Sequence, residues 1–433
     1  MAWSAIGVPT RSRSCPSTAE AGLRLTPEDR ALLDGSKGPA LRLAADMVVA
    51  VAEAERAPRL VDIVAGHIDG CLYHGQAGLD FALALAEGGG EVAVPTTLNV
   101  ASLDLLHPDL YRGDPETAAR ARRLMDAYVD LGCRSTWTCA PYQLPERPKK
   151  GAQIAWGESS AIVFANSVLG ARTNRYGDFL DICCALIGRA PLTGLHTDQG
   201  RWATVVVELD VPDSLLDSDL LYPTLGHVIG EIAGNSVSAI LGLDHRADAD
   251  RLKGLGASAA SSGSVGMFHA VGVTPEAPDL TTALGGTEDP ARLTVDLDRL
   301  ERARRCLSGT RGPVAAVSVG TPHMSLAEIA QLAEMAKGRR STMPFYVNTS
   351  RHVLAAIEEN SHAKTLRRFG ATFVTDTCTY VTPIIGEVDG AVMTNSGKWA
   401  FYAPANLGVE VVFASLGDCV ETAVSGETVQ ERW

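Results

Sequence analysis

Three cysteines of this sequence have neighbours unlike those of ordinary core thiols. Cys71 lies in HIDGCLYHG, Cys139 in TWTCAPY and Cys378 in TDTCTY, so turn-forming or hydroxyl residues flank each sulfur. Cysteine sulfurs bind iron or zinc once they are deprotonated. No Cys-x-x-Cys, His-Glu-x-x-His or ferredoxin-type run occurs, so a metal centre would have to be assembled from distant segments. Buried, inert thiols are the alternative interpretation.

Two histidines offer a different kind of metal site. His67 and His74, together with a distant carboxylate, would suit zinc or a single iron ion. Their spacing is not diagnostic, because a histidine beside a glycine is more often a hydrogen-bonding loop residue.

An arginine-rich loop is a candidate anion site. Residues 161–165 (AIVFA) are strand-like, and Arg172, Asn174 and Arg175 follow before a helix expected from about residue 178 to Gly188. Guanidinium forks and the free amides of a helix start both favour carboxylates. A solvated loop with surface arginines is equally compatible with this segment.

The last third of the sequence alternates strands with polar loops. We expect strands at residues 313–320, 345–347, 371–374 and 391–393, and a helix over residues 325–337. The loops after these strands are TPH, NTSRH, TDTC and TNSGK. Because ligands bind at the carboxyl ends of parallel strands, these loops predict one shared site that contains Asp376, Cys378, Ser396 and Lys398. A desolvated Lys398 would have a lowered pKa and could act as a base.

The bulk composition predicts a globular enzyme of several domains. The chain has 433 residues, of which 46% are hydrophobic and 21% are charged. The net charge of −13, without a basic cluster, argues against nucleic-acid binding. Apolar runs are too short to cross a membrane, and no secretory signal is evident, so we expect a cytoplasmic protein.

We expect a loose tail over residues 1–24, because folding signals begin at Thr26-Pro27-Glu28-Asp29, a good helix start. Residues 25–433 should form two or three α/β units with mostly parallel sheets, divided near residues 190 and 310. Nucleotide-binding glycine loops and the Gly-x-Ser-x-Gly string are missing. Hydride transfer, phosphoryl transfer and serine hydrolysis are therefore poor candidates.

Taken in order, several long strings of the chain resemble the large subunit of the aconitase X family. The resemblance runs from about Leu25 to the end. The strings are HIDGCLYHG, VPTTLNVASLD, STWTCAPYQ, GESSAIVFANSVLGARTNRYG, GSVGMFHAVGVTPEA, TDTCTY and TNSGKWAFYAPANLGVEVV.

The resemblance implies an aconitase-like, multi-domain α/β fold with an interdomain cleft and an iron-dependent dehydration reaction. Bacterial members of the family act on cis-3-hydroxy-L-proline, giving pyrroline-2-carboxylate, and archaeal members act on mevalonate 5-phosphate; HIDGCLYHG resembles the bacterial form. It implies Cys71, Cys139 and Cys378 as ligands of iron or of an iron–sulfur cluster, with a [2Fe–2S] centre as one form.

The expected roles of the remaining residues complete this hypothesis. Lys398, Asp376 and Ser396 are the expected catalytic residues. The expected substrate-binding residues are Arg172, Arg175, Asn174, His74, Thr96 and Thr97.

The family also implies a small swivel domain that contributes a catalytic serine. We find no such domain in this chain and expect it on a separate small subunit, without which the chain should be folded but nearly inactive. Two alternatives remain open. One is mevalonate 5-phosphate dehydration, and the other is a non-catalytic iron–sulfur subunit that senses iron or redox state or serves as a scaffold.

Overall fold

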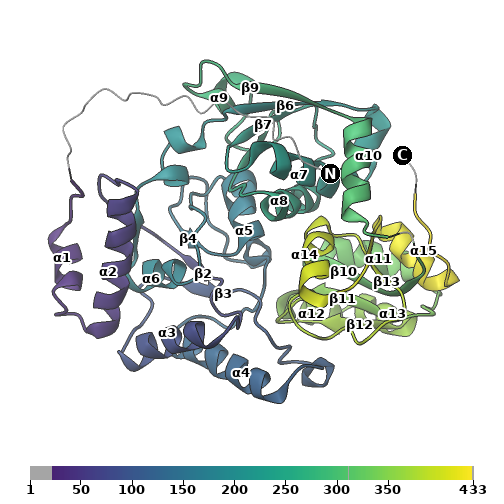
Figure 1. Cartoon of the computed structure of the whole chain (residues 1–433), viewed down its shortest axis with the longest axis horizontal. Coiled ribbons are helices and arrows are strands. Elements are labelled where there is room, and N and C mark those ends of the chain that lie inside the picture. Colours follow the sequence, from purple (N-terminus) through teal and green to yellow (C-terminus); the bar gives the residue numbers. More distant parts are fainter. Residues whose placement is uncertain (1–21, 311, 432–433) are drawn as a thin grey trace, which may run out of the picture.

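The computed structural model of the chain describes residues 22–310 and 312–431. The tail expected over residues 1–24 therefore lies, for residues 1–21, outside the described part. Three α/β units follow one another along the chain (Figure 1). The first unit runs from α1 to β5, the second from β6 to α10 and the third from β10 to α15. No described helix has both the length and the apolar character that a membrane crossing requires.

The first unit is built on short strands joined by long loops. A three-stranded parallel sheet has the order β3-β2-β4, and β1 pairs with β5 antiparallel. Its elements are α1 (Pro27–Leu33), α2 (Pro39–Ala54), β1 (Leu60–Asp62), β2 (Gly66–Ile68), α3 (Gln76–Glu87), β3 (Thr96–Leu98), α4 (Pro115–Asp130), β4 (Ala155–Trp156), α5 (Ser159–Phe164), a π-helical turn (Ala165–Leu169), α6 (Leu180–Ile187) and β5 (Arg189–Pro191).

Two local predictions for this unit have opposite outcomes. The helix start at Thr26 is confirmed, because Thr26 and Asp29 form a reciprocal capping box at the start of α1. The strand predicted over residues 161–165 is wrong, because these residues lie in α5 and the π-helical turn. The side chain of Glu158 accepts the amide of Ala161 at 2.5 Å and so caps α5, which directs the apolar run into a helix.

The second unit is a four-stranded, fully parallel sheet with the order β8-β7-β6-β9. Its helices α7 and α8 share one apolar core with the sheet. The elements are β6 (Val205–Asp210), α7 (Leu221–Ala233), β7 (Ser238–Leu241), α8 (Ala249–Ser262), β8 (Phe268–Ala270), α9 (Leu280–Leu284), β9 (Ala291–Asp296) and α10 (Leu297–Leu307).

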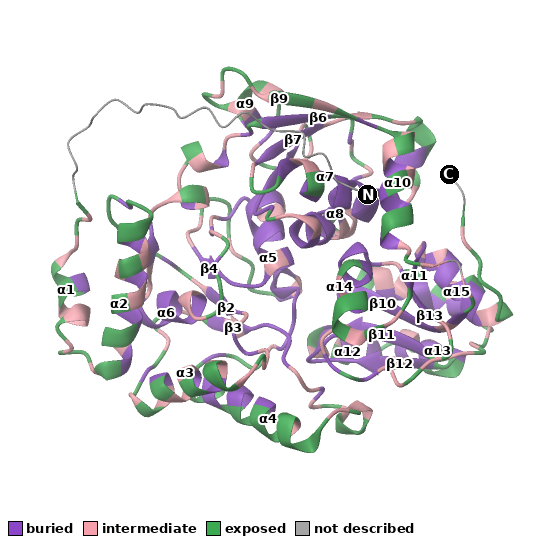
Figure 2. Ribbon diagram, viewed as in Figure 1, coloured by how far each residue is buried: buried purple, intermediate pink, exposed green. Residues whose placement is uncertain are grey.

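The third unit is a five-stranded parallel sheet with the order β12-β11-β10-β13-β14. Two separate apolar clusters pack against it, and its strands are largely coloured as buried in Figure 2. The elements are β10 (Val314–Met324), α11 (Leu326–Ala336), β11 (Phe345–Thr349), α12 (Arg351–Glu358), α13 (Ser361–Phe369), β12 (Ala371–Val374), β13 (Ala391–Thr394), α14 (Gly397–Leu407), β14 (Val411–Phe413) and α15 (Leu416–Ser425).

The strands predicted in this third unit are confirmed, and so is the fold class of several α/β units with mostly parallel sheets. Helix α14 packs closely on α8 of the second unit. A Cβ built on Gly397 would lie 2.2 Å from the hydroxyl oxygen of Ser258, so glycine is needed at this contact. The start of α14 is therefore held in a fixed position at the boundary between two units.

Candidate metal centre and substrate site

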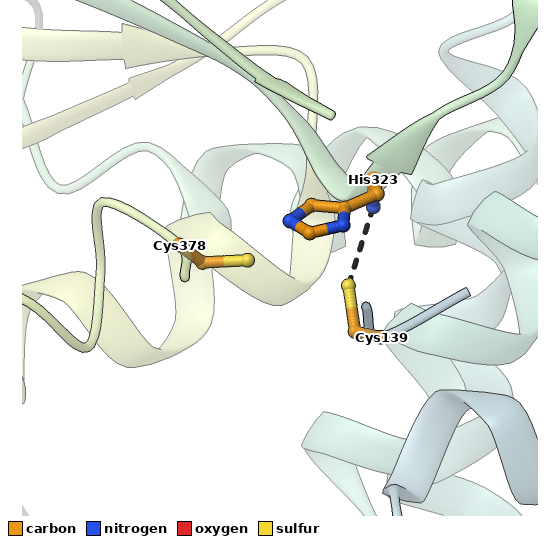
Figure 3. A group of neighbouring side chains, drawn as sticks. All are labelled: Cys139, His323 and Cys378. Atoms are coloured by element: carbon orange, nitrogen blue, oxygen red, sulfur yellow. Dashed lines mark hydrogen bonds between the residues drawn. The ribbon is translucent and has the colours of Figure 1, made fainter. Parts of the chain in front are cut away.

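Three side chains from two units meet in one buried group. The candidate ligand atoms of Cys139, His323 and Cys378 all lie within 4.8 Å of one another, and Figure 3 shows the side chains pointing together. Cys139 comes from a loop of the first unit, His323 from the end of β10, and Cys378 from the turn after β12. The first and third units must therefore be docked for this group to exist.

Hydrogen bonds orient the histidine in this group. The backbone amide of His323 donates to the Cys139 sulfur at 3.3 Å (Figure 3). Its Nε2 lies 3.0 Å from the carbonyl oxygen of Thr377, which can only accept, so Nε2 carries the proton. Nδ1 then keeps a lone pair and faces the Thr138 hydroxyl at 3.0 Å. A second partner that fixes the tautomer in this way is typical of a metal-binding histidine.

The two cysteines of the group have opposite acidities. Burial opposes ionisation of Cys139, but a hydrogen bond from Cys378, together with the electrostatic effects of the nearby His323 ring and of Lys398, outweighs it and lowers the pKa of Cys139 to about 6. The hydrogen bond to Cys139, together with burial, raises the pKa of Cys378. The pair therefore holds one thiolate at neutral pH, and the thiolate is the form of cysteine that binds metals.

A buried ion pair lies beside the cysteines. Nζ of Lys398, at the start of α14, donates to Oε1 of Glu158, and both side chains are almost fully buried. The other oxygen of Glu158 accepts the Ser160 hydroxyl at 2.7 Å. Burial favours neutral Lys398, but Glu158 outweighs this effect and raises the pKa of Lys398 well above its usual value. The lowered pKa expected for Lys398 is therefore wrong, and this side chain is a cation.

Arg175 extends the site on the side of the second unit. Its Nη1 donates to the carbonyl oxygens of Ala260 and Val265 at 3.3 and 3.1 Å. Partial burial lowers its pKa, while Tyr402 and Glu158 act in the opposite direction. Tyr402 stacks on Tyr380 with ring centroids 5.8 Å apart. Arg175 therefore lies within electrostatic range of Glu158, and among the described residues its Nε and Nη2 have no hydrogen-bond partner.

A carboxyl group at the end of β2 completes the polar surroundings. Asp69 accepts a hydrogen bond from the side-chain amide of Asn99, and its backbone amide donates to Asp181 at 2.7 Å. Burial, followed by the charges of Glu158, Asp178 and Asp181, raises the pKa of Asp69 to about 8. Asp69 thus carries a proton at neutral pH.

Two of the three predicted cysteine ligands belong to the group. Cys71 does not, and its thiol lies 3.4 Å from the carbonyl oxygens of both Ile68 and Asn99, either of which can accept its one hydrogen. Burial raises the pKa of Cys71 well above its usual value. A third backbone oxygen, that of Val100, lies 3.6 Å from this sulfur, and Val100 packs against Cys139 and Cys378. Val100 therefore lies between Cys71 and the three residues of the group.

The other predicted catalytic residues have structural partners. Asp376 forms a bidentate ion pair with Arg351 at 2.8 and 2.6 Å. It also accepts a hydrogen bond from the backbone amide of Leu105 at 3.1 Å. Ser396 caps α14, because its hydroxyl oxygen accepts the amide of Trp399 at 3.0 Å. Neither side chain is free to take a proton from a substrate without losing these contacts.

The predicted substrate-binding residues are spread more widely. Arg172 pairs with Asp198 and lines a hollow that contains none of the three metal-group residues. Asn174 bonds to the backbone of Thr193 and Leu195, and His74 is exposed. Thr96 donates to the carbonyl oxygen of Val94, and Thr97 contacts Nδ1 of His67 at 2.8 Å. The structure thus brings Arg175, but not Arg172, to the buried ion pair.

Sequence reasoning did not select His323, Glu158 or Asp69. His323 ends the predicted strand-end loop TPH, Glu158 lies in GESSAIVFANSVLG and Asp69 lies in HIDGCLYHG. Each residue therefore lies in a polar segment at or after the end of a strand, and polarity at the end of a strand is the signal that could have identified it.

Sequence and structure comparisons agree on one family. Models of the aconitase X first, second and third domains match residues 22–199, 203–305 and 314–425. The cis-3-hydroxy-L-proline dehydratase of Pseudomonas aeruginosa is 45% identical over 97% of this chain and 73% of its own length. The phosphomevalonate dehydratase large subunit of Methanosarcina mazei is 36% identical over 93% of this chain and 98% of its own length. The crystal structure of Thermococcus kodakaraensis aconitase X in its holo form superposes with a TM-score of 0.82 at 32% identity, covering 92% of this chain and 100% of that one.

Proposed function

This chain belongs to the aconitase X family, and we propose that it is a hydro-lyase that dehydrates cis-3-hydroxy-L-proline to pyrroline-2-carboxylate. The substrate assignment rests on the 45% identity, over 97% of the chain, to a dehydratase of that substrate. A second such dehydratase, from Hypocrea jecorina, is 40% identical over 95% of the chain. The family relationship and the class of reaction do not depend on this choice of substrate.

Cys139, His323 and Cys378 would hold an iron or iron–sulfur centre. Two sulfurs and one imidazole are donors that iron accepts, and a buried pair that already favours one thiolate fits such a centre. When bound, the centre would serve as a Lewis acid for the departing 3-hydroxyl group. Cys71 stays a predicted ligand of a larger cluster, because only the segment around Val100 separates it from the group.

Arg175 is suited to bind the substrate carboxylate. Its Nη1 is occupied by two carbonyl oxygens, and this leaves Nε and Nη2 as a planar pair of donors for a carboxylate. Proximity to Glu158 places this guanidinium beside the buried ion pair. The carboxylate would therefore be anchored on one side while the ring lies toward the cysteines.

Lys398 would stabilise negative charge that develops when the C2 proton leaves. Glu158 holds its ammonium group in a fixed position away from bulk water, where a charge acts more strongly than at the surface. Because the pKa of Lys398 is raised, the side chain acts as a fixed cation and not as a base.

The base that removes the C2 proton would come from a small swivel subunit. Asp376 is tied to Arg351, Ser396 caps α14 and Lys398 is positively charged, so none of the three residues predicted as catalytic is free for this task. The relative from Methanosarcina mazei is named a large subunit, which supports a two-component enzyme. As the family implies, the partner would contribute a serine.

Mevalonate 5-phosphate dehydration is the second candidate, favoured by the relatives named phosphomevalonate dehydratase large subunit. That substrate needs cations for a phosphate as well as for a carboxylate. At this site the ion pair with Glu158 holds Lys398 in place beside the reacting carbon, which leaves Arg175 to bind one anionic group. The geometry therefore favours the hydroxyproline.

Anaerobically purified chain, combined with the small subunit from the same source, tests the proposal. We expect it to contain iron and to convert cis-3-hydroxy-L-proline to pyrroline-2-carboxylate, with little turnover of mevalonate 5-phosphate. The chain without the small subunit should be folded but nearly inactive. Preference for mevalonate 5-phosphate would overturn the substrate, and full activity of the chain alone would overturn the two-component enzyme.

A further inference from the structure

A hollow of about 360 Å³ lies where the first and second units meet, apart from the metal group. The first unit contributes Lys150 and Arg172 to its lining, the connection between β5 and β6 contributes Asp198 and Trp202, and the second unit contributes His269. None of these side chains has a role in the dehydration proposed above.

One buried acceptor in the lining has no partner. His269 is only 2% exposed, and its Nε2 lies 2.8 Å from the carbonyl oxygen of Arg201. That oxygen can only accept, so Nε2 carries the proton and Nδ1 keeps a lone pair. Among the described residues no group donates to Nδ1. Burial lowers the pKa of His269, which keeps the ring neutral and Nδ1 an acceptor. A ligand that donates an N–H or O–H would satisfy it.

Two cations of the lining have donors to spare. Nζ of Lys150 donates to the carbonyl oxygen of Pro275 at 2.5 Å, and two of its three hydrogens remain available. Arg172 uses Nη1 for the carbonyl oxygen of His196 and Nη2 for Asp198, and its Nε has no partner in the described part of the chain. These donors suit a carboxylate.

Arg201, which also lines the hollow, is committed to the protein. Its Nε and Nη2 donate to the two carboxylate oxygens of Glu276 at 2.8 and 2.9 Å. Its Nη1 donates to Asn166 and to the carbonyl oxygen of Leu195, both at 3.0 Å. Arg201 therefore has a structural role in the lining, and Lys150 and Arg172 are the groups that can bind an anion.

A rigid aromatic side chain adds an apolar face. Trp202 lies against two consecutive glycines, because a Cβ on Gly285 would lie 2.3 Å from the indole and one on Gly286 would lie 2.7 Å from it. Side chains at these two positions would collide with the indole, so the two glycines make room for Trp202. Such a surface suits the ring of a small ligand.

We propose that this junction hollow is a second ligand site, which binds a small cyclic imino acid. The carboxylate would contact Lys150 and Arg172, the ring would lie on Trp202, and the ring N–H would donate to Nδ1 of His269. Asp198, whose side chain is 79% exposed at the rim, would balance the positive charge on the ligand nitrogen. The site assigns to Arg172 an anion-binding role separate from that of Arg175, and it does not depend on the proposed dehydration.

Binding of L-proline to the full-length chain tests this site, because L-proline has no hydroxyl group and cannot be dehydrated. Calorimetry should show saturable binding that is about tenfold weaker in both Lys150→Gln and Arg172→Gln. Lys149→Gln removes the adjacent lysine, which does not line the hollow, and should leave the affinity unchanged. Arg175→Lys should leave the affinity of the hollow unchanged even where it weakens binding of L-proline at the metal site, because Arg175 does not line the hollow, so failure of the dehydration proposal would not affect the result.

A second probe tests the histidine without any mutation. Tetrahydrofuran-2-carboxylate has an oxygen in place of the ring N–H and should bind about tenfold more weakly than L-proline. Equal binding of the two molecules would remove His269 from the site. No saturable binding of L-proline, equal binding by the wild type and both hollow variants, or a loss confined to Arg175→Lys would overturn the proposal.

Discussion

The first and third units supply the metal group in different ways. The third unit places His323 and Cys378 at the carboxyl ends of β10 and β12, two strands that β11 separates in a five-stranded sheet packed against two apolar clusters. The first unit holds Cys139 in a loop beside a sheet whose strands have only two or three residues. Regular strands fix the position of a side chain by register, whereas a loop depends on individual hydrogen bonds. The loop side of the site should therefore be the more sensitive to single substitutions outside the ligands.

The largest expected effect is the loss of either cysteine of the group. Cys139→Ser and Cys378→Ser should each remove most of the iron and lower turnover more than about a hundredfold, because a hard hydroxyl replaces a thiolate. Iron analysis and steady-state turnover of anaerobically purified protein measure this. Cys306→Ser is the control, since Cys306 is exposed.

The iron content of Cys71→Ser would show whether the first unit supplies one ligand or two. If Cys71 only bonds to backbone oxygens, the variant should keep its iron. Loss of iron equal to that of Cys139→Ser would show that the first unit contributes two ligands. Full iron content in both Cys139→Ser and Cys378→Ser would remove the group as the metal site.

The buried ion pair should give the next largest effect. Lys398→Met leaves Glu158 buried without its partner and should lower the free energy of unfolding by about 3–5 kcal/mol. The double variant with Glu158→Gln should recover part of this loss, because no unpaired charge remains. Urea unfolding of the single and double variants measures the coupling. Additive losses would mean that the pair does not connect the first and third units.

Substitution of the two arginines should affect binding more than stability. Arg175→Lys should raise the KM for cis-3-hydroxy-L-proline about tenfold, because a planar pair of donors is lost while the charge stays. Arg172→Lys should leave that KM unchanged, although the sequence predicted both residues in the substrate site. A raised KM in Arg172→Lys but not in Arg175→Lys would show that the substrate of the dehydration binds in the junction hollow.

A pH dependence of stability, which leaves catalysis untouched, is expected from His196 in the connection between β5 and β6. Burial, followed by the charges of Arg201 and Arg172, lowers the pKa of His196 to about 4. The unfolded chain takes up the proton near pH 6.5 and the folded chain does not, so stability should fall as the pH drops from about 6.5 to 4.

This loss should be on the order of 3 kcal/mol, and His196→Gln should remove most of it. His245→Gln is the matched control, because the side chain of His245 is 90% exposed. Urea unfolding between pH 4 and 7 gives the two slopes. Equal slopes for the wild type and His196→Gln would contradict this assignment.

The sequence predicted the strands of the third unit better than those of the first unit. In the third unit, apolar runs with polar ends identified the strands and the position of Cys378, because periodicity and strand ends are local signals. In the first unit, residues 161–165 have the same apolar character but form a helix, because the capping side chain of Glu158 decides the outcome. A short apolar run does not carry that information by itself.

The raised pKa of Lys398 was not predictable from the sequence, and the reason is a different one. Its partner Glu158 lies 240 positions away in the sequence, so only the folded chain reveals the ion pair. Desolvation alone would lower the pKa of Lys398, and the buried carboxylate reverses the sign. The candidate ligands are also far apart in the sequence, with 184 positions between Cys139 and His323, which is why no local metal motif was visible.

The division of the metal group between two units also has a mechanical consequence. Cys139 belongs to one unit while His323 and Cys378 belong to another, so an ion bound by all three would clamp the units together and add its binding free energy to their docking. Removal of the ion by a chelator should then open this boundary before either sheet unfolds. Proteases would cut first between α10 and β10, the connection into the third unit, and iron supply would set the lifetime of the whole chain as well as its activity.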